Sequence, residues 1–438
     1  MNRDHSEGNG VELLENPVRD YAWGSRTHLP RLLGLEPDGR PWAELWMGSH
    51  PTAPSRVPDG RSLRDVIAED PDSWLGARLR STYGDRLPFL MKLLAAAQPL
   101  SLQVHPTADR ARVRWTEQNA AGLPLDAPER TYPDPTHKPE MVLALTRFEG
   151  MAGFRDPVKT AAILRGLGLP WLDDVARTME ASREPELTLR EVTTDLLGRS
   201  GDALAADLDD LRRASAIAAV DSHRRQAGRR KGVADDPTLV ERESVRVYAA
   251  TGALAERYPT DPGVLVTLLL NHVVLAAGEA MFVDAGVIHA YSSGFGVEIM
   301  AESDNVLRAG LTVKHVDVPE LLEVTDFRPM PPPLWQPREV RLGAITGRLF
   351  APPVAEFELV VTDVADRSAE FTAGAQVLLC LTGEVTVRTA GGQETVVPAG
   401  RAIVAGDRDG AIVVEGRGRV VVGRSAGEAS AEGEEEED

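Results

Sequence analysis

Gln103 and His105 lie two residues apart in residues 101–106, a run with the composition of a β-strand. Successive side chains on a strand point to opposite faces, so residues two apart share a face and can bind one metal ion. Further ligands can come from two later turns, which contain Glu140 and His289. These four side chains would form a site of nitrogen and oxygen donors.

Two imidazoles, one amide and one carboxylate are a donor set that suits Zn²⁺, which keeps a labile position for water or substrate when it is catalytic. Because Glu140 is the only charged ligand of the four, the site would have a net charge of about +1 and remain a good Lewis acid. A hydroxyl or carbonyl oxygen is the group that such an ion polarises. The pattern therefore predicts one zinc ion per chain.

The overall charge and composition limit the possible partners and compartment. A formal net charge of −19 argues against non-specific nucleic-acid binding, which needs a basic face. The single cysteine, Cys380, cannot form an internal disulfide and fits a reducing compartment. Residues 1–20 are polar and the apolar window 264–283 is interrupted by polar side chains, so we expect neither a signal peptide nor a membrane span. These features predict a soluble, cytoplasmic protein.

A helical segment is expected between two stretches whose composition is typical of β-strands. Residues 11–150 are rich in Pro, Gly and Trp with short apolar runs, a pattern typical of many short strands and turns. At residue 156 the texture changes, because Asp156 is a typical N-cap and Pro157 follows it at the first helical position. Leucines then recur at helical spacing: Leu204, Leu208 and Leu211.

Strand-like texture returns after residue 261 and leads into His289, so the helical segment interrupts a β-domain whose ligands come from both sides of it. The proline-rich stretch 331–337 is typical of a linker, and Val-rich runs with Gly turns follow it. In this second β-domain, Ile403 stands where His289 falls in the first, which predicts a barrel without metal. The expected segments are the first part of a catalytic barrel (1–154), a helical insertion (155–258), the second part of that barrel (259–330), a C-terminal barrel (331–427) and a disordered acidic tail (428–438).

Six motifs, in this order, resemble those of type I mannose-6-phosphate isomerase, a zinc enzyme of the cupin superfamily. They are Tyr21–Gly24, Ala43–Pro51, Pro99–Pro106, His137–Met141, His289–Tyr291 and Ser303–Thr312. The resemblance covers most of residues 12–425 and is weakest in the helical insertion and the C-terminal barrel. It implies a mainly β fold with an α-helical insertion, in which two cupin-type β-barrels (jelly rolls) accompany a helical domain.

The resemblance also implies ligands, a reaction and catalytic residues. Zinc would be held by Gln103, His105, Glu140 and His289. The reaction would interconvert mannose 6-phosphate and fructose 6-phosphate by moving a proton between neighbouring carbons through an enediolate. The candidates for catalysis are Arg308 for the developing oxyanion, Glu298 or Lys138 for proton transfer, and His137 for a relay during ring opening. The sequence does not choose between the two candidate bases.

An acidic chain must create positive potential locally to bind a sugar phosphate. The candidates for contacts to the substrate and its phosphate are Ser101, Lys92, Asp304 and Lys314, together with Arg308. Two departures from the family pattern concern local geometry only: Glu302 replaces a small residue, and Val313 replaces a proline.

Two other functions fit parts of the same pattern. An iron or manganese cupin oxygenase would favour two histidines and one carboxylate, and the amide of Gln103 would be an unusual fourth ligand there. A non-catalytic regulator that binds sugar phosphates is the second alternative. The expected partner is a small-molecule sugar phosphate, with no nucleic acid and no membrane, and the chain is expected to be a monomer or a weak homo-oligomer.

Overall fold

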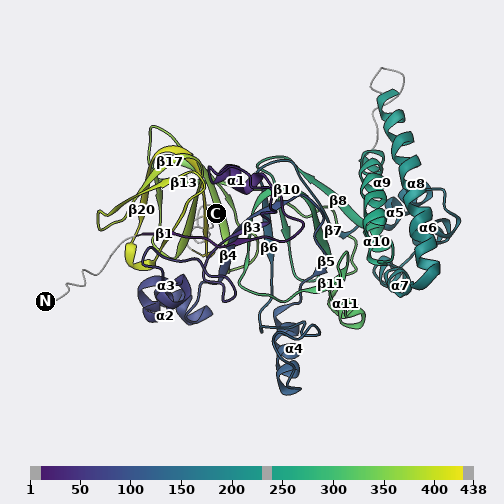
Figure 1. Cartoon of the computed structure of the whole chain (residues 1–438), viewed down its shortest axis with the longest axis horizontal. Helices are drawn as coiled ribbons and strands as arrows, with labels where there is room; N and C mark the ends of the chain where they lie inside the picture. Colours follow the sequence, from purple (N-terminus) through teal and green to yellow (C-terminus); the bar gives the residue numbers. More distant parts are fainter. Residues whose placement is uncertain (1–10, 229–238, 428–438) are drawn as a thin grey trace, which may run out of the picture.

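The protein consists of two antiparallel β-sheets that lie side by side, with a bundle of helices at one end (Figure 1). This computed structural model describes residues 11–228 and 239–427, so the predicted acidic tail lies outside the described residues. The predicted fold class, mainly β with a helical insertion, is confirmed. Within the two described ranges, no helix combines the length and the apolar character that crossing a membrane requires.

The first barrel is a sheet of eleven strands within the described residues. Seven of them follow the order β12-β9-β6-β10-β4-β3-β2, and the other four join the sheet through β10 and its neighbours. The strands are β2 (Val18–Arg19), β3 (Glu44–Met47), β4 (Phe89–Ala96), β5 (Leu102–Val104), β6 (Glu140–Ala144), β7 (Phe148–Phe154), β8 (Leu270–Leu275), β9 (Ala280–Val283), β10 (His289–Ala301), β11 (Leu307–Gly310) and β12 (Leu334–Trp335).

Strand β10 connects the two groups of strands in the first barrel. Its first residues pair with β5 and β7, and its last residues pair with β4 and β6. The register shifts between Tyr291 and Ser293, an irregularity of the kind that bends a strand from one group toward the other. As a result, His289 and Glu298 lie on one strand that touches both halves of the barrel.

The helical insertion lies at the end of the first barrel that faces away from the second sheet (Figure 1). Its helices are α5 (Pro157–Arg165), α6 (Pro170–Ala181), α7 (Pro185–Gly198), α8 (Gly201–Gly228) and α9 (Leu239–Arg257). Asp156 caps α5 as expected, because its side chain accepts hydrogen bonds from the backbone N–H groups of Val158 and Lys159. The three leucines of α8 with helical spacing, Leu204, Leu208 and Leu211, are buried in the helical core.

Several short helices surround the barrels, and the sequence analysis missed those in residues 11–150. They are α1 (His28–Leu32), α2 (Leu63–Glu69), α3 (Pro71–Tyr83) and α4 (Ala108–Ala120), followed later by α10 (Gly263–Val266), η2 (Thr267–Leu269) and α11 (Val318–Val324). Ser62, Asp70 and Thr107 cap α2, α3 and α4 with their side chains. Ser, Asp and Thr are typical N-cap residues, but the same residue types are also common in turns, so they do not by themselves identify a helix start.

The second barrel is a nine-stranded antiparallel sheet within the described residues, and the N-terminal strand of the chain joins its edge. Ile403 is buried in its core. Its strands are β1 (Glu12–Leu14), β13 (Arg338–Leu342), β14 (Ile345–Phe350), β15 (Glu358–Val364), β16 (Ala369–Phe371), β17 (Gln376–Arg388), β18 (Glu394–Pro398), β19 (Ala402–Ala405) and β20 (Ile412–Arg424), and η3 (Asp407–Asp409) follows β19.

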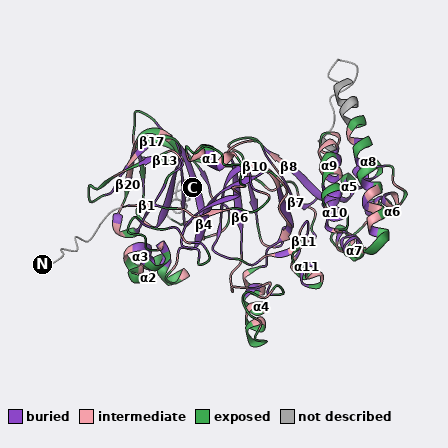
Figure 2. Ribbon diagram, in the orientation of Figure 1, coloured by how far each residue is buried: buried purple, intermediate pink, exposed green. Residues whose placement is uncertain are grey.

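The two barrels share one apolar core, which forms part of the continuous buried region in Figure 2. Strands β4 and β10 of the first barrel pack there against β15, β17 and β20 of the second. Gly423 of β20 permits the close approach: an added Cβ would lie 3.0 Å from Cδ1 of Ile299 and 3.1 Å from Sδ of Met91. A side chain at this position would push the barrels apart.

We therefore expect Gly423→Val to destabilise the whole protein by about 1–3 kcal/mol, the usual cost of overpacking a core. Chemical denaturation measures this change in the free energy of unfolding. Gly198→Val is the matched control, because no atom lies within 4 Å of a Cβ added there. Equal stability of the two variants would contradict this account of the interface.

Candidate metal centre and active site

Three buried ligand atoms converge inside the first barrel. Side-chain donors of His105, Glu140 and His289 all lie within 4.8 Å of one another. Nε2 of His105 is 3.3 Å from Oε2 of Glu140, and Nε2 of His289 is 3.1 Å from Oε1 of the same carboxylate. Gln103 faces His289 across the β5–β10 pair, and the amide Nε2 lies 3.3 Å from Nε2 of His289. The structure thus brings the four predicted ligands together.

Backbone carbonyl groups orient both imidazoles. Nδ1 of His105 donates to the carbonyl oxygen of Asn305 at 2.7 Å, and Nδ1 of His289 donates to that of Val287 at 2.8 Å. A proton on each Nδ1 leaves the lone pair of each Nε2 free to bind a metal. Burial, aided by the positive charge of Lys138, lowers the pKa of His105 to about 4, so this ring is neutral at pH 7.

Glu140 is ionised although it is almost completely buried. Burial alone would raise the pKa of its carboxyl group, but Lys138 and His289 outweigh it and hold the pKa well below the usual range. Lys138 donates a short hydrogen bond to Oε2 of Glu140 and lies 3.3 Å from Nε2 of His105. The hydroxyl group of Tyr291 donates to Oε1 of Glu140 at 2.8 Å. Two imidazoles around an ionised, hydrogen-bonded carboxylate are a donor set that fits a divalent cation.

A second group of buried charges lies on neighbouring strands of the same barrel. Lys92 and Glu298 are directly opposite each other on β4 and β10, and Nζ of Lys92 lies 3.0 Å from Oε2 of Glu298. Nζ of Lys92 also lies 3.9 Å from Oε1 of Glu44 and over the ring of Trp46. Glu44 and Trp46 belong to the motif Ala43–Pro51. Their contact with Lys92 depends on the pairing of β3 with β4, which the motif alone does not reveal.

The two members of this ion pair have shifted pKa values. Burial raises the pKa of Glu298 above its ordinary value; the charge of Lys92 opposes the shift, and those of Glu140 and Glu44 add to it. Burial alone would lower the pKa of Lys92, but Glu298 and Glu44 outweigh it and raise the pKa. Lys92, which we predicted as a phosphate contact, is thus a buried ammonium group between two carboxylates.

Asp304 and His50 form a contact at the edge of the site. Nε2 of the buried His50 lies 3.4 Å from Oδ1 of Asp304, whose side chain is 44% exposed. Burial would raise the pKa of Asp304, but the hydrogen bond and charge of His50 lower it below the ordinary value. Sequence reasoning missed His50 as a site residue, although it stands in the quoted motif Ala43–Pro51.

The remaining candidates lie on the loops around the centre. Arg308 of β11 stands opposite Gln103, and within the part of the chain that the structure describes it has no ion-pair partner. Burial lowers the pKa of Arg308. The pKa of Lys314 is also lowered, first by burial and second by the positive charge of Arg308, so the two cations lie near each other. Ser101 is half-buried just before β5. His137 is also half-buried, and its Nε2 lies 2.8 Å from Oε1 of Glu356, which the sequence analysis missed.

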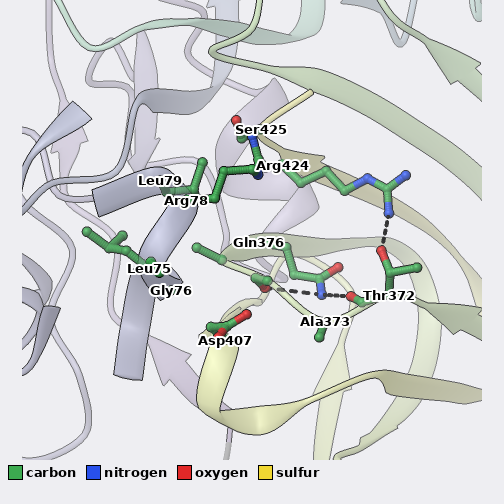
Figure 3. Close-up of a pocket in the computed structure, with 13 residues that line it drawn as sticks. Leu75, Gly76, Arg78, Leu79, Thr372, Ala373, Gln376, Asp407, Arg424 and Ser425 are labelled. Carbon is green, nitrogen blue, oxygen red and sulfur yellow. Dashed lines mark hydrogen bonds between the residues drawn. The ribbon is translucent and has the colours of Figure 1, made fainter. Parts of the chain in front are cut away.

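A cavity of about 170 Å³ lies elsewhere, between α3 and the second barrel. Figure 3 shows that Gln376 and Arg424 donate there to the backbone oxygen and the hydroxyl group of Thr372, respectively. None of the predicted site residues lines this cavity. This cavity is therefore separate from the cluster of His105, Glu140 and His289 in the first barrel.

An antiparallel barrel with an interior site of two histidines and one carboxylate defines a metal-dependent enzyme of the cupin class. The family model for the phosphomannose isomerase type I catalytic domain matches residues 11–157. The mannose-6-phosphate isomerase of Escherichia coli K12 is 37% identical over 418 residues, which cover 94% of this chain and 98% of the relative. The human mannose-6-phosphate isomerase is 33% identical over 411 residues, covering 86% of this chain and 88% of the relative.

Solved structures of mannose 6-phosphate isomerases are also similar to this chain. Mannose 6-phosphate isomerase from Salmonella typhimurium, bound to fructose 6-phosphate and zinc, superposes with a TM-score of 0.80 at 35% identity and covers 95% of this chain and 99% of that chain. This chain belongs to the type I mannose-6-phosphate isomerase family. The predicted family, cupin fold and isomerase class are confirmed, whereas the roles of individual residues stay predictions.

Gln103→Ala should weaken zinc binding by roughly 10-fold or more, because loss of a direct ligand should cost at least as much as loss of a residue that supports one. Competition with a chromophoric chelator measures the affinity. Gln98→Ala is the control, since the half-buried Gln98 accepts a hydrogen bond from Arg257 and is not one of the candidate ligands. Unchanged zinc stoichiometry and affinity in Gln103→Ala would remove this residue from the ligand set.

Proposed function

We propose that this chain is a zinc-dependent isomerase that interconverts mannose 6-phosphate and fructose 6-phosphate. The observation that carries the proposal is the convergence of His105, Glu140 and His289 inside the barrel of a chain that belongs to this family. The Salmonella relative was solved with zinc and fructose 6-phosphate, which supports the same cofactor and substrate here. The family assignment sets aside the oxygenase and the non-catalytic regulator. The oligomeric state and the cytoplasmic location stay predictions.

Zinc would be held by the two imidazoles, the carboxylate of Glu140 and the amide oxygen of Gln103. When bound, it supplies Lewis-acid stabilisation to an oxygen of the substrate that becomes negative in the enediolate. The protein prepares this centre in advance, since the backbone fixes both rings and Tyr291 and Lys138 fix Glu140. Such preorganised charge costs no rearrangement during the reaction.

Glu298 is the base in this proposal, and Lys138 the proton donor. Glu298 is a buried carboxylate whose raised pKa makes it a better proton acceptor than an exposed glutamate. Lys138 is already engaged with Glu140, next to His105, so its ammonium group stands beside the metal ligands where substrate oxygens would lie. His137, paired with Glu356, is positioned to relay a proton during ring opening.

Cations that lack carboxylate partners are the best candidates for the substrate's negative charges. Arg308 is half-buried beside Gln103, where it can stabilise the developing oxyanion, and Lys314 lies nearby for the phosphate with Ser101. Asp304 can accept a hydrogen bond from a sugar hydroxyl group. Lys92 is committed to Glu298 and Glu44, so we assign it the role of adjusting the pKa of the base instead of binding phosphate.

Arg308→Ala should lower turnover by about 10²- to 10³-fold, because removal of one preorganised donor to an oxyanion typically costs that much. A coupled assay for fructose 6-phosphate with mannose 6-phosphate as substrate measures the rate, and zinc analysis of the same sample checks that the metal is retained. Arg112→Ala, an exposed arginine of α4, is the control. Absence of isomerisation by the wild-type, zinc-loaded protein would overturn the proposed function, and normal turnover of Arg308→Ala would remove only this residue.

The acid limb of the pH profile should follow the charges around Glu298. A base works when deprotonated, so kcat/KM falls as the pH drops through its pKa. Lys92→Met removes the cation that lowers this pKa and should move the limb to higher pH, whereas Glu44→Gln removes an anion that raises it and should move the limb to lower pH. Opposite shifts support the assignment, with thermal melts to confirm folding. A limb that stays fixed in both folded variants would exclude Glu298 as the base.

A further inference from the structure

A second cavity, of about 500 Å³, lies where the helical insertion meets the first barrel and the linker to the second. Its walls come from three places: α5 with the residues before it, α9, and the junction of β8 with residues 329–332. The volume falls in the range of small-molecule sites, roughly 300–1,000 Å³. None of the residues assigned to the metal centre or to the substrate lines it.

The charges that line this cavity are basic on balance, in a chain whose net charge is −19. Its two carboxylates are already occupied. Glu243 accepts from Nε of Arg155 at 2.8 Å and from the backbone N–H of His272 at 3.1 Å. Asp156 accepts from the backbone N–H groups at the start of α5. Arg155 is also engaged, because its Nη1 and Nη2 donate to the carbonyl oxygens of Leu268 and Leu270.

Arg246 is the unsatisfied group of the cavity. Its Nε is buried and has no hydrogen-bond partner, and its two other nitrogens make only long bonds of 3.4 Å to the carbonyl oxygens of Arg242 and His272. No carboxylate of the described residues lies within ion-pair distance of this half-buried guanidinium group. Glu243 and Glu149 act on Arg246 through space without forming an ion pair with it. A partly desolvated cation without an ion pair is costly, and a guanidinium group matches the oxygens of phosphate in geometry and charge. Lys159 and Arg242 contribute further positive charge to the same lining.

Part of the lining is apolar, and hydrogen bonds hold its backbone at Met330. Met330, Pro331 and Pro332 form it, and the backbone oxygen of Met330 accepts from Nδ2 of Asn271 at 3.0 Å. The same amide donates to the carbonyl oxygens of Ala152 and Gly153 in β7. Because Ala152 pairs with the metal ligand His289, only one strand pair separates this wall from the metal centre. This part of the lining therefore offers an apolar surface in the same cavity as the cations.

We propose that this cavity binds a small phosphate monoester, with the phosphate on Arg246 and Lys159 and the organic part against Met330 and the two prolines. The site is distinct from the one that binds the isomerase substrate. It would let the enzyme sense a phosphorylated metabolite at the junction between the insertion and the barrel.

Isothermal titration calorimetry of the zinc-loaded, full-length protein tests the proposal with three probes: inorganic phosphate, glycerol 3-phosphate and adenosine 5′-monophosphate. Binding of the nucleotide should weaken by about tenfold or more in Arg246→Gln, because a charge-assisted contact to phosphate is lost. Lys159→Gln should weaken it in the same direction. Tighter binding of the nucleotide than of the other two probes would show that the organic part contacts the apolar wall.

The controls separate this site from the active centre and from general charge effects. Arg308→Ala should leave the nucleotide affinity unchanged, and so should Arg257→Ala, an exposed arginine of the same helix α9. Arg246→Gln should keep wild-type isomerase activity and melting temperature, since it loses only long hydrogen bonds. Wild-type affinity of Arg246→Gln for every probe, loss of binding in Arg308→Ala instead, or no binding of any probe at millimolar concentration would overturn the proposal.

Discussion

The active centre depends on keeping an ionised carboxylate inside the barrel. Burial of an isolated ion costs on the order of several kcal/mol, so the negative charge of Glu140 requires compensation from every side. Two imidazoles, an ammonium group and a phenol supply it, and they come from three separate segments of the chain. The arrangement is possible because β10 pairs with strands of both groups and so holds His289 and Tyr291 next to the start of β6. A divalent cation suits this collection of lone pairs and charge.

The same balance of charges distinguishes the roles of the other cations. Lys92 is buried beside the carboxylates of Glu44 and Glu298. Its positive charge neutralises them in part and lowers the pKa of Glu298. Arg308 is half-buried and has no carboxylate partner among the described residues, so it remains able to bind an anion. Arg246 also has no carboxylate within ion-pair distance among the described residues, and it lines a different cavity, where the helical insertion meets the first barrel. In an acidic chain, cations left without partners identify where anions can bind.

Parts of the candidate site could be proposed from the sequence because their signals are local. Gln103 and His105 are two residues apart, although β5 ends at Val104, just before His105. Asp156 with Pro157 marks the start of the helical insertion, and both signals depend on neighbouring residues only. The contacts of Glu44, His50 and Glu356 were missed, because each depends on the pairing of distant strands or on the packing of one barrel against the other. The assignment of Lys92 to phosphate had the same cause, since its carboxylate partners on β3 and β10 become neighbours only through strand register.

The central claim is that the isomerase activity requires one zinc ion bound at His105, Glu140 and His289. The direct measurement is metal content by plasma emission spectrometry, made on the same samples as mannose 6-phosphate isomerisation, before chelation, after chelation and after zinc is added back. The account predicts that activity disappears with the metal and returns in proportion to zinc, up to one ion per chain. Full turnover by a sample shown to contain no metal would contradict it.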